Sequence, residues 1–254
     1  MDRMIYTALN ALRVNRDAQV AQAQNLANQT VPGFRRDLPN EGASKFLTAM
    51  DSATTRAFQL ETGPAPFSEM QGALTRTDEE LDVAISGDGY FFVQPASGEP
   101  ALSRRGDLRR DVDGTLRDGA GAAMLGPDMA PITLPAYRDI RITDIGEIYI
   151  RPVDEPGGEA VLAGVLATVI PPEDAKLTKG ADGHVRGAEG TALPPPDQRG
   201  AVLQGTLEGS NVNPVEELLG TMELQRRFEM GMRMMLAARE IDESGARVMQ
   251  APEG

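Results

Sequence analysis

The longest amphipathic pattern in the chain lies near its carboxyl end. Between Ser210 and Val248, apolar side chains recur in steps of three, four and six residues, which keeps them on one broad face of a helix. Asn213 is a suitable N-cap, Pro214 fits the first helical position, and Glu216 completes a capping box. The pattern therefore predicts a helix of roughly 35 residues, about 50 Å long. Its apolar positions are Val215, Leu218, Leu219, Met222, Phe228, Met232, Met235 and Leu236.

A second helical pattern occupies the amino-terminal segment, residues 2–28. Its apolar stripe consists of isoleucine and leucines at heptad-like spacing, padded by alanines. Neither helix can bury its stripe alone, and the two ends of the chain carry opposite net charge. We therefore expect the two terminal helices to pair as a coiled-coil-like layer. The stripe contains Ile5, Leu9, Leu12 and Leu26.

Between these two patterns the periodicity changes to that of strands. Leu81, Val83 and Ile85 alternate with polar residues, and a Gly-Asp-Gly turn at 87–89 then leads into aromatic residues. This arrangement predicts a β-hairpin over 81–94. The predicted fold class is therefore α+β, with an all-β middle domain inserted between the terminal helices. Further strands are expected at 132–134, 140–143, 148–151 and 161–170.

These patterns divide the chain into four segments. Residues 1–35 form the amino-terminal helix, which is expected to pair with a carboxyl-terminal helix at 210–254. Residues 36–77 are rich in Ser, Thr, Pro and Gly and lack a lasting periodicity, which predicts an extended connector with one helical piece near 44–58. Residues 78–209 form the β-rich middle domain.

The composition excludes several classes of function. The net charge of −13 leaves no basic patch for nucleic acid, so we expect no nucleic-acid partner. The absence of cysteine excludes disulfides and thiolate metal sites, and a single histidine argues against a catalytic triad. We expect no cofactor, no metal and no small-molecule substrate. The chain also lacks a signal-peptide pattern and a run of about 18 apolar residues, so neither signal cleavage nor membrane insertion is expected.

One short motif carries enzymatic chemistry in other proteins. Asp111-Val112-Asp113-Gly114-Thr115 fits the Asp-x-Asp-Gly-Thr pattern of haloacid-dehalogenase-type phosphatases, in which the first Asp attacks phosphorus and the second acts as acid and base. That chemistry requires the first Asp at the end of a buried strand of an α/β sheet, whereas two arginines precede it here. We interpret the motif as an Asp-Gly hairpin turn. A phosphatase remains the remote alternative.

Three blocks of the sequence, in the same order, resemble flagellar basal-body rod proteins. The first is the opening segment with its Asn-Leu-Ala-Asn and Pro-Gly-Phe-Arg motifs, the second is the predicted hairpin, and the third is a Gly-Thr-Leu-Glu-Gly-Ser-Asn junction with the Arg-Phe-Glu-Met that follows it. Pro32 before Gly33 favours the proximal-rod form, because the distal-rod form usually has Asn at that position. Taken together, the matches span roughly residues 1–35, 74–126 and 203–248.

This resemblance implies a non-enzymatic structural subunit of the proximal rod. Such a subunit polymerises with copies of itself and with other rod subunits through contacts that do not close, its terminal helices lining the rod and its β-rich middle lying outside. The resemblance also implies a place in the periplasm-spanning rod of the flagellar basal body, reached through the type III export apparatus without signal cleavage. A sister axial subunit, of the distal rod or hook type, is the alternative. The candidate residues for packing between subunits are Ile5, Leu9, Leu12, Asn25, Leu26, Asn28, Asn211, Asn213, Leu218, Met222, Phe228, Met232 and Met235.

Overall fold

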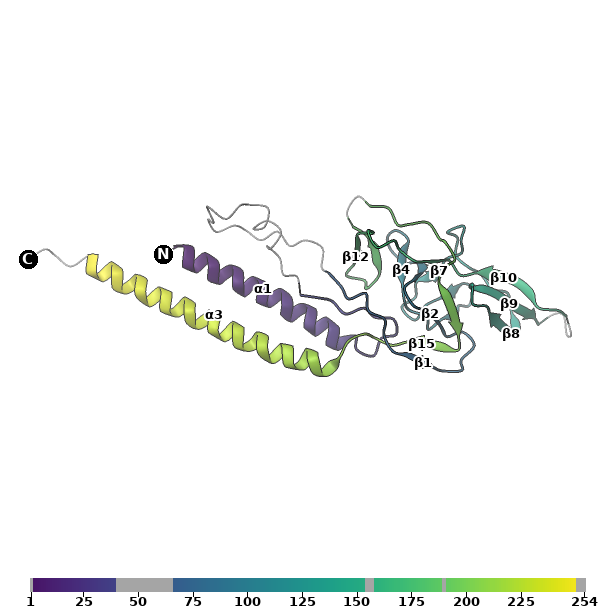
Figure 1. The fold of residues 1–254 in the computed structure, drawn as a ribbon, viewed down its shortest axis with the longest axis horizontal. Coiled ribbons are helices and arrows are strands. Elements are labelled where there is room, and N and C mark those ends of the chain that lie inside the picture. Colours follow the sequence, from purple (N-terminus) through teal and green to yellow (C-terminus); the bar gives the residue numbers. More distant parts are fainter. Residues whose placement is uncertain (1, 40–65, 154–157, 189–190, 250–254) are drawn as a thin grey trace, which may run out of the picture. The chain divides into compact units, whose positions relative to one another are not determined.

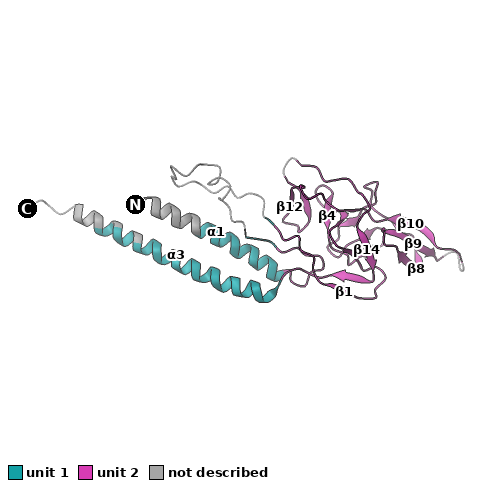
Figure 2. Cartoon of the chain, in the orientation of Figure 1, with its two compact units in different colours: residues 1–27, 37–66, 213–254 teal, residues 28–36, 67–212 magenta. Residues whose placement is uncertain are grey.

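A computed structural model describes residues 2–39, 66–153, 158–188 and 191–249 of the chain, although the side chains of 2–11, 238, 242 and 245–249 are not described (Figure 1). The predicted helical piece near 44–58 lies outside the described residues. The chain divides into two compact units (Figure 2). Unit 1 contains residues 1–27, 37–66 and 213–254, and unit 2 contains residues 28–36 and 67–212.

Unit 1 is built on two helices, α1 (Asp2–Ala27) and α3 (Pro214–Met249). The predicted start of α3 is confirmed. The Asn213 side-chain oxygen accepts a hydrogen bond from the backbone N–H of Val215 at 3.1 Å, and its amide donates to the Glu216 carboxylate at 3.2 Å. Acidic residues in the first turn also suit the positive end of the helix dipole.

The two helices run antiparallel and side by side within unit 1 (Figure 1). Polar and small residues contribute to the contact between them. The Asn15 amide donates to the backbone oxygen of Leu224 at 2.9 Å, and the Thr221 hydroxyl donates to the Gln22 side-chain oxygen at 3.2 Å. Gly220 lies directly beneath Gln22, since a Cβ added to this glycine would come within 2.0 Å of the Gln22 amide nitrogen.

The predicted coiled-coil-like layer is therefore wrong. In a coiled coil the apolar side chains of the two helices would interlock along the seam, but Leu218 and Met222 remain 53% and 56% exposed. The side of α3 that packs in unit 1 carries the buried Glu217 together with Gly220 and Thr221, one turn apart. The neighbouring helix packs on a different side of α3 from Leu218 and Met222.

The strands of unit 2 form four sheets, and every strand pair in the described part of the chain is antiparallel. The β-rich middle is thus present as predicted. In spatial order, the largest sheet contains β12 (Leu177–Lys179), β13 (Val185–Gly187), β4 (Ala101–Ser103), β3 (Tyr90–Gln94), β7 (Ala123–Met124), β6 (Leu116–Arg117) and β5 (Arg109–Arg110), with β11 (Thr168–Val169) paired to β3.

The three smaller sheets contain the remaining strands of unit 2. One has the order β10 (Val161–Val165), β9 (Glu147–Pro152) and β8 (Tyr137–Ile142). A second pairs β14 (Ala201–Gln204) with β2 (Val83–Ser86), and a third pairs β1 (Leu74–Arg76) with β15 (Thr206–Glu208). The strands predicted at 140–143 and 148–151 correspond to β8 and β9, and the strand predicted at 161–170 corresponds to β10 and β11. The strand predicted at 132–134 is not formed, and Thr133 makes only an isolated bridge with Thr115.

The hairpin predicted over 81–94 is not formed, although both of its strands exist. β2 pairs with β14 and β3 pairs with β4, so the turn at Gly87 carries the chain from one sheet to another. The physical reason is burial. Val83 and Ile85 are inaccessible to solvent, and so is Ala84 between them, so β2 is covered on both faces. A half-exposed hairpin strand would leave one face in water.

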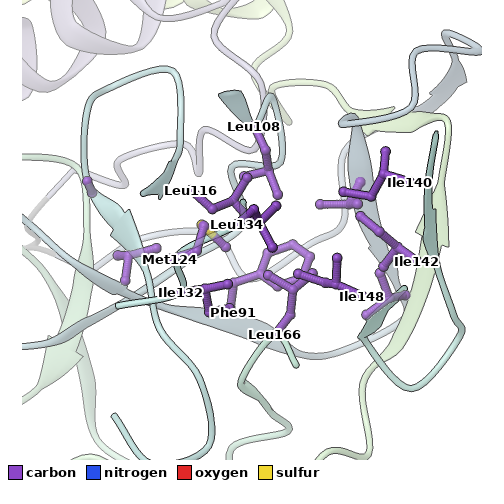
Figure 3. Packing of buried hydrophobic residues seen from close by; sticks show 14 of the residues in the cluster. Phe91, Leu108, Leu116, Met124, Ile132, Leu134, Ile140, Ile142, Ile148 and Leu166 are labelled. Carbon is purple, nitrogen blue, oxygen red and sulfur yellow. The ribbon is translucent and has the colours of Figure 1, made fainter. Parts of the chain in front are cut away.

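Strand β3 separates two hydrophobic clusters. Phe91 and Val93 belong to the larger cluster, whereas Tyr90 and Phe92 belong to the other, as expected for alternating side chains of a strand buried on both faces. Figure 3 shows Phe91 within the larger cluster. Complete burial of a side chain of this size contributes about 1.5–3 kcal/mol, so this cluster holds the sheets of unit 2 together.

Neither α1 nor α3, as far as they are described, has an apolar stretch that would suffice to span a bilayer.

Candidate subunit interface

An exposed apolar surface runs along α3. At its beginning, Val215, Leu218, Leu219 and Met222 lie on the side of the helix opposite Glu217 and Thr221, and all four are exposed. We call these four residues the outer face of α3. Large contiguous apolar surfaces mark sites where soluble proteins contact other proteins, membranes or ligands. Exposed apolar side chains continue along the helix at Phe228, Met230, Met232, Met234, Leu236 and Ile241.

Methionine is the most frequent residue among these later positions. Its unbranched side chain adapts to partner surfaces of different shape. Ion pairs at i and i+4 lie between the apolar residues, including Glu223 with Arg227 at 2.6 Å and Arg239 with Glu243 at 2.8 Å. These pairs are exposed and stabilise the helix only slightly, by about 0.3–0.5 kcal/mol each. The apolar side chains are therefore the part of this surface that would gain most from a partner.

The other apolar candidates have less accessible positions. Leu12 and Leu26 of α1 and Met235 of α3 are half-buried within unit 1. A Cβ added to Gly231 would approach Leu12 to 3.2 Å, so Leu12 already contacts α3. The side chains of Ile5 and Leu9 lie outside the described residues.

Two asparagine candidates near the end of α1 serve the local backbone. The Asn25 amide donates to the backbone oxygen of Asp37 at 2.8 Å, and its side-chain oxygen accepts from the backbone N–H of Asp37 at 2.7 Å. Asn28 accepts a hydrogen bond from the N–H of Val31 through its backbone oxygen at 3.1 Å. Asn25 is almost inaccessible to solvent, and both ends of its side-chain amide bond to Asp37 of the same chain.

Asn211 joins three segments of unit 2. Its side-chain oxygen accepts from the N–H of Arg36 at 2.6 Å, and its amide donates to the backbone oxygens of Met70 at 2.7 Å and Ser68 at 3.2 Å. These contacts bring together the turn that follows α1, the segment that leads to β1, and the segment that leads into α3. Asn211 thus organises the place where both chain ends enter unit 2.

A buried ionic cluster lies at the same place, and it was not predicted from the sequence. The Glu208 carboxylate contacts the guanidinium groups of Arg35 and Arg104, each at 3.0 Å, and all three residues are at most 3% exposed. Burial lowers the pKa of Arg104, and the Glu208 carboxylate opposes that effect. We call these three residues the clasp. Arg35 and Glu208 lie within motifs that resemble rod proteins, but no spacing rule brings together charges so far apart in the chain.

The phosphatase motif lies in a turn between two antiparallel strands. Asp111 forms an ion pair with Arg117 at 3.0 Å, and the Asp113 carboxylate accepts from the N–H of Thr115 at 3.0 Å. This N–H and the Thr115 hydroxyl lower the pKa of Asp113. The preceding strand β5 is short and exposed. The surroundings are those of the hairpin turn that the sequence analysis favoured, and they differ from the buried strand that the chemistry requires.

Comparison with known proteins identifies the two halves of this architecture. A family model described as "Flagellar hook protein FlgE/F/G D1 domain" matches residues 84–150, within unit 2. A second, described as "Flagellar basal body rod FlgEFG protein C-terminal", matches residues 203–248, which include β15 and almost all of α3. The β-rich middle is therefore of the flagellar rod and hook type, as the sequence analysis predicted.

Full-length relatives agree with this assignment. A Salmonella typhimurium protein named flagellar basal-body rod protein FlgF is 32% identical over 98% of both chains, and the Escherichia coli FlgF protein shows the same identity and coverage. A Buchnera aphidicola protein named FlgG is 29% identical over 88% of this chain and 89% of its own. This chain therefore belongs to the flagellar basal-body rod protein family and is FlgF-like.

Proposed function

We propose that this chain is a structural subunit of the flagellar basal-body rod, in its proximal part, and that the outer face of α3 attaches it to neighbouring subunits. The observation that carries this proposal is the exposure of Leu218 and Met222 on a long helix, in a chain that is FlgF-like over 98% of its length. The sides of α3 that pack within unit 1 are already occupied. The apolar outer face is available for a neighbour.

The physical chemistry favours such an assembly. Burial of apolar surface contributes roughly 25 cal/mol per Å², or about 1.5–3 kcal/mol for each side chain that becomes fully buried. The four residues of the outer face would thus contribute several kcal/mol per contact before the entropy of association is subtracted. When the contact joins different surfaces of successive subunits and does not close into a ring, the same contact repeats along a filament. A rod requires this kind of repetition.

The partners follow from this role. They are copies of the same chain and other axial subunits of the rod, and the subunit reaches the periplasm-spanning rod through the flagellar type III export apparatus without signal cleavage. In this role the chain is not an enzyme, and it needs no cofactor. Family membership supports these points, and the antiparallel turn around Asp111 and Asp113 agrees with a structural role.

A distal-rod subunit is the second candidate, because relatives named FlgG also match most of the chain. They do so at lower identity and coverage, 29% over 88% of this chain compared with 32% over 98% for FlgF. Pro32, which precedes Gly33, also favours the proximal form. Imaging of basal bodies from a strain that lacks the gene distinguishes the two candidates. Loss of the proximal rod supports the proposal, whereas a rod interrupted only at its distal end supports the alternative.

The outer face is tested in the same strain by complementation. Leu218→Asp places a charge in the outer face, and Gln225→Asp places the same charge at an exposed polar position of the same helix. We expect Leu218→Asp to prevent swimming and to leave no rod, whereas Gln225→Asp restores both. Purified Leu218→Asp protein should retain the circular dichroism spectrum of the wild type. Normal swimming of the Leu218→Asp strain would exclude the outer face from assembly.

A further inference from the structure

Both chain ends enter unit 2 along two adjacent segments. We call residues 28–36, which follow α1, and residues 208–212, which precede α3, the helix roots. The N–H of Gly33 donates to the backbone oxygen of Glu208 at 2.8 Å, and the N–H of Asn211 donates to that of Phe34 at 3.2 Å. With the Arg36 contact to the Asn211 side chain, these bonds hold the two roots together within unit 2.

The clasp lies beneath this pair of roots. Arg35 comes from the amino-terminal root, Glu208 from the start of the other root, and Arg104 from the segment after β4. The Glu208 carboxylate also accepts from the backbone N–H of Gly72 at 2.9 Å, and Arg35 donates to the backbone oxygen of Met70. One buried carboxylate therefore connects four segments that are far apart in the sequence.

The two arginines differ in how firmly they belong to unit 2. Arg104 also donates to the backbone oxygens of Ile85 and Gly87, and its guanidinium lies 5.2 Å from the centre of the Tyr90 ring. It would stay paired with Glu208 if Arg35 were absent. Arg35 is the clasp residue supplied by the amino-terminal root. Its removal leaves a neutral buried pair, whereas removal of Glu208 leaves two buried like charges.

Other contacts position the amino-terminal root for this bond. Gly33 has a φ of +66°, and a Cβ at this position would lie 2.4 Å from the backbone carbonyl of Arg104, so only glycine fits. The Lys179 ammonium lies 3.6 Å from the centre of the Phe34 ring and donates to the backbone oxygen of Arg35 at 2.6 Å. The root thus lies closely against unit 2 on both sides of Arg35.

We propose that the Arg35–Glu208–Arg104 clasp keeps the amino-terminal root folded onto the rest of unit 2. A force that acts on the chain leading to α1 then reaches the strands of unit 2 through this clasp. The second part rests on the proposed function, because this chain carries a torque only as a subunit of a rotating rod. Without the clasp, the amino-terminal root would retain its backbone contacts with Glu208 and Asn211 but lose the buried ion pair between Arg35 and Glu208.

The first part is tested on the purified full-length chain by hydrogen exchange resolved at single amides. Arg35→Met removes the root's contribution and leaves the Arg104–Glu208 pair intact, while Arg76→Met removes an exposed arginine of the same unit as a matched control. In Arg35→Met we expect the amides of Gly33, Arg36 and Asn211 to exchange at least about tenfold faster. The amide of Phe92, which donates to Ala167 in the core, should keep its rate.

Three outcomes would overturn the clasp. The first is that the exchange rates of the root amides are unchanged in Arg35→Met. The second is that these rates rise equally in Arg76→Met, and the third is that the exchange of the Phe92 amide in Arg35→Met accelerates as much as that of the root amides. Glu208→Gln provides an independent check, since it leaves two arginines without a counter-charge. We expect it to accelerate the same root amides more than Arg35→Met does, and a smaller effect would contradict the proposal.

The mechanical part is tested by swimming in viscous medium. A strain with Arg35→Met should assemble rods, because the outer face of α3 is intact, but should lose speed under load more steeply than the Arg76→Met strain. If the two strains swim equally fast under load while the root amides of Arg35→Met exchange faster, the clasp stabilises the root but has no mechanical role. Failure of the proposed function is recognised separately, by rods that persist when the gene is deleted.

Discussion

The side-chain amide of Asn15 on α1 donates a hydrogen bond to the backbone oxygen of Leu224 on α3, at 2.9 Å. Asn15 is buried, and the bond joins residues that are 209 positions apart. A polar side chain thus stands where a coiled coil would place an apolar one. Specific polar contacts and a close backbone approach contribute to the helix pair, and Leu218 and Met222 of α3 stay exposed.

Asn15→Asp should weaken the helix pair. The substituted carboxylate has the same shape but no N–H to donate, and it would face the Leu224 oxygen in a buried position. We expect a loss of about 1–3 kcal/mol in the free energy of unfolding of α1, because an unpaired buried polar group costs about that much. Urea titration followed by circular dichroism at 222 nm measures it. Gln225→Glu introduces the same charge at an exposed position, and an equal loss in that variant would refute the role of Asn15.

Loss of the α3 cap should also be measurable. Asn213→Ala removes the side-chain oxygen that accepts from the N–H of Val215, as well as the bond to Glu216. We expect a cost of about 1 kcal/mol and fraying of the first turn. Asn213→Asp retains the acceptor and should keep most of the stability. If Asn213→Ala and Asn213→Asp unfold at the same urea concentration, the cap does not contribute.

The helix start was predictable because all of its determinants are local. Asn213, Pro214 and Glu216 lie within four positions, and each acts through its own backbone neighbourhood. The partners of β2 were not predictable for the opposite reason. Its neighbour β14 comes more than a hundred residues later, while the adjacent Gly87 turn imitates a hairpin. Local turn chemistry identified a change of direction but not the sheet to which the chain goes.

The candidate site shows the same division. Periodicity found Leu218 and Met222, since an apolar stripe is a property of one helix, but it could not decide which side of that helix would be covered. Glu208 and Arg35 were missed because a charged residue next to a glycine or after an aromatic residue is normally exposed. Their burial depends on a pairing that spans the whole chain. Only the fold brings these two charges together.

Limited proteolysis should distinguish the terminal segments from the β-rich part. Among the described side chains, the helices of unit 1 bury few apolar ones, whereas Phe91 and Ile148 of unit 2 are fully buried. We therefore expect a protease to trim both ends of the isolated chain and to leave a fragment of about residues 78–208, because local opening is easiest where few apolar contacts are lost. Mass spectrometry of the fragments reports this. Cleavage inside 78–208 before the ends are trimmed would show the opposite distribution of stability.

The phosphatase alternative has a direct test. With a generic phosphate ester and Mg²⁺, we expect no turnover by the purified chain above a buffer blank. Asp111 is engaged by Arg117 in an exposed turn, without the buried strand that would position it as a nucleophile. Turnover that disappears in Asp111→Asn but persists in Asp128→Asn, a control carboxylate from a different turn, would establish an enzyme.

The stability of unit 2 should depend on pH through Asp182. Hydrogen bonds from the Arg186 guanidinium, with the N–H of His184 contributing, lower the pKa of this carboxyl to about 2, from 3.8 in the absence of these contacts. A carboxyl with a depressed pKa in the folded state stabilises the fold fully above pH 3.8, and this contribution is lost as the pH falls to about 2. The free energy of unfolding should therefore decrease across that window.

Two variants isolate the contribution of Asp182. Asp182→Asn should be less stable than the wild type at neutral pH and should lose less stability between pH 4 and pH 2, because the amide does not titrate. Arg186→Gln removes the main cause of the shift, so the Asp182 carboxyl in the folded state should titrate nearer its ordinary pKa, and the acid-induced loss of stability should be smaller than in the wild type. Chemical denaturation at several pH values measures all three proteins. If the acid-induced loss is the same in the wild type and in Asp182→Asn, the pH dependence of unit 2 arises from other carboxyls.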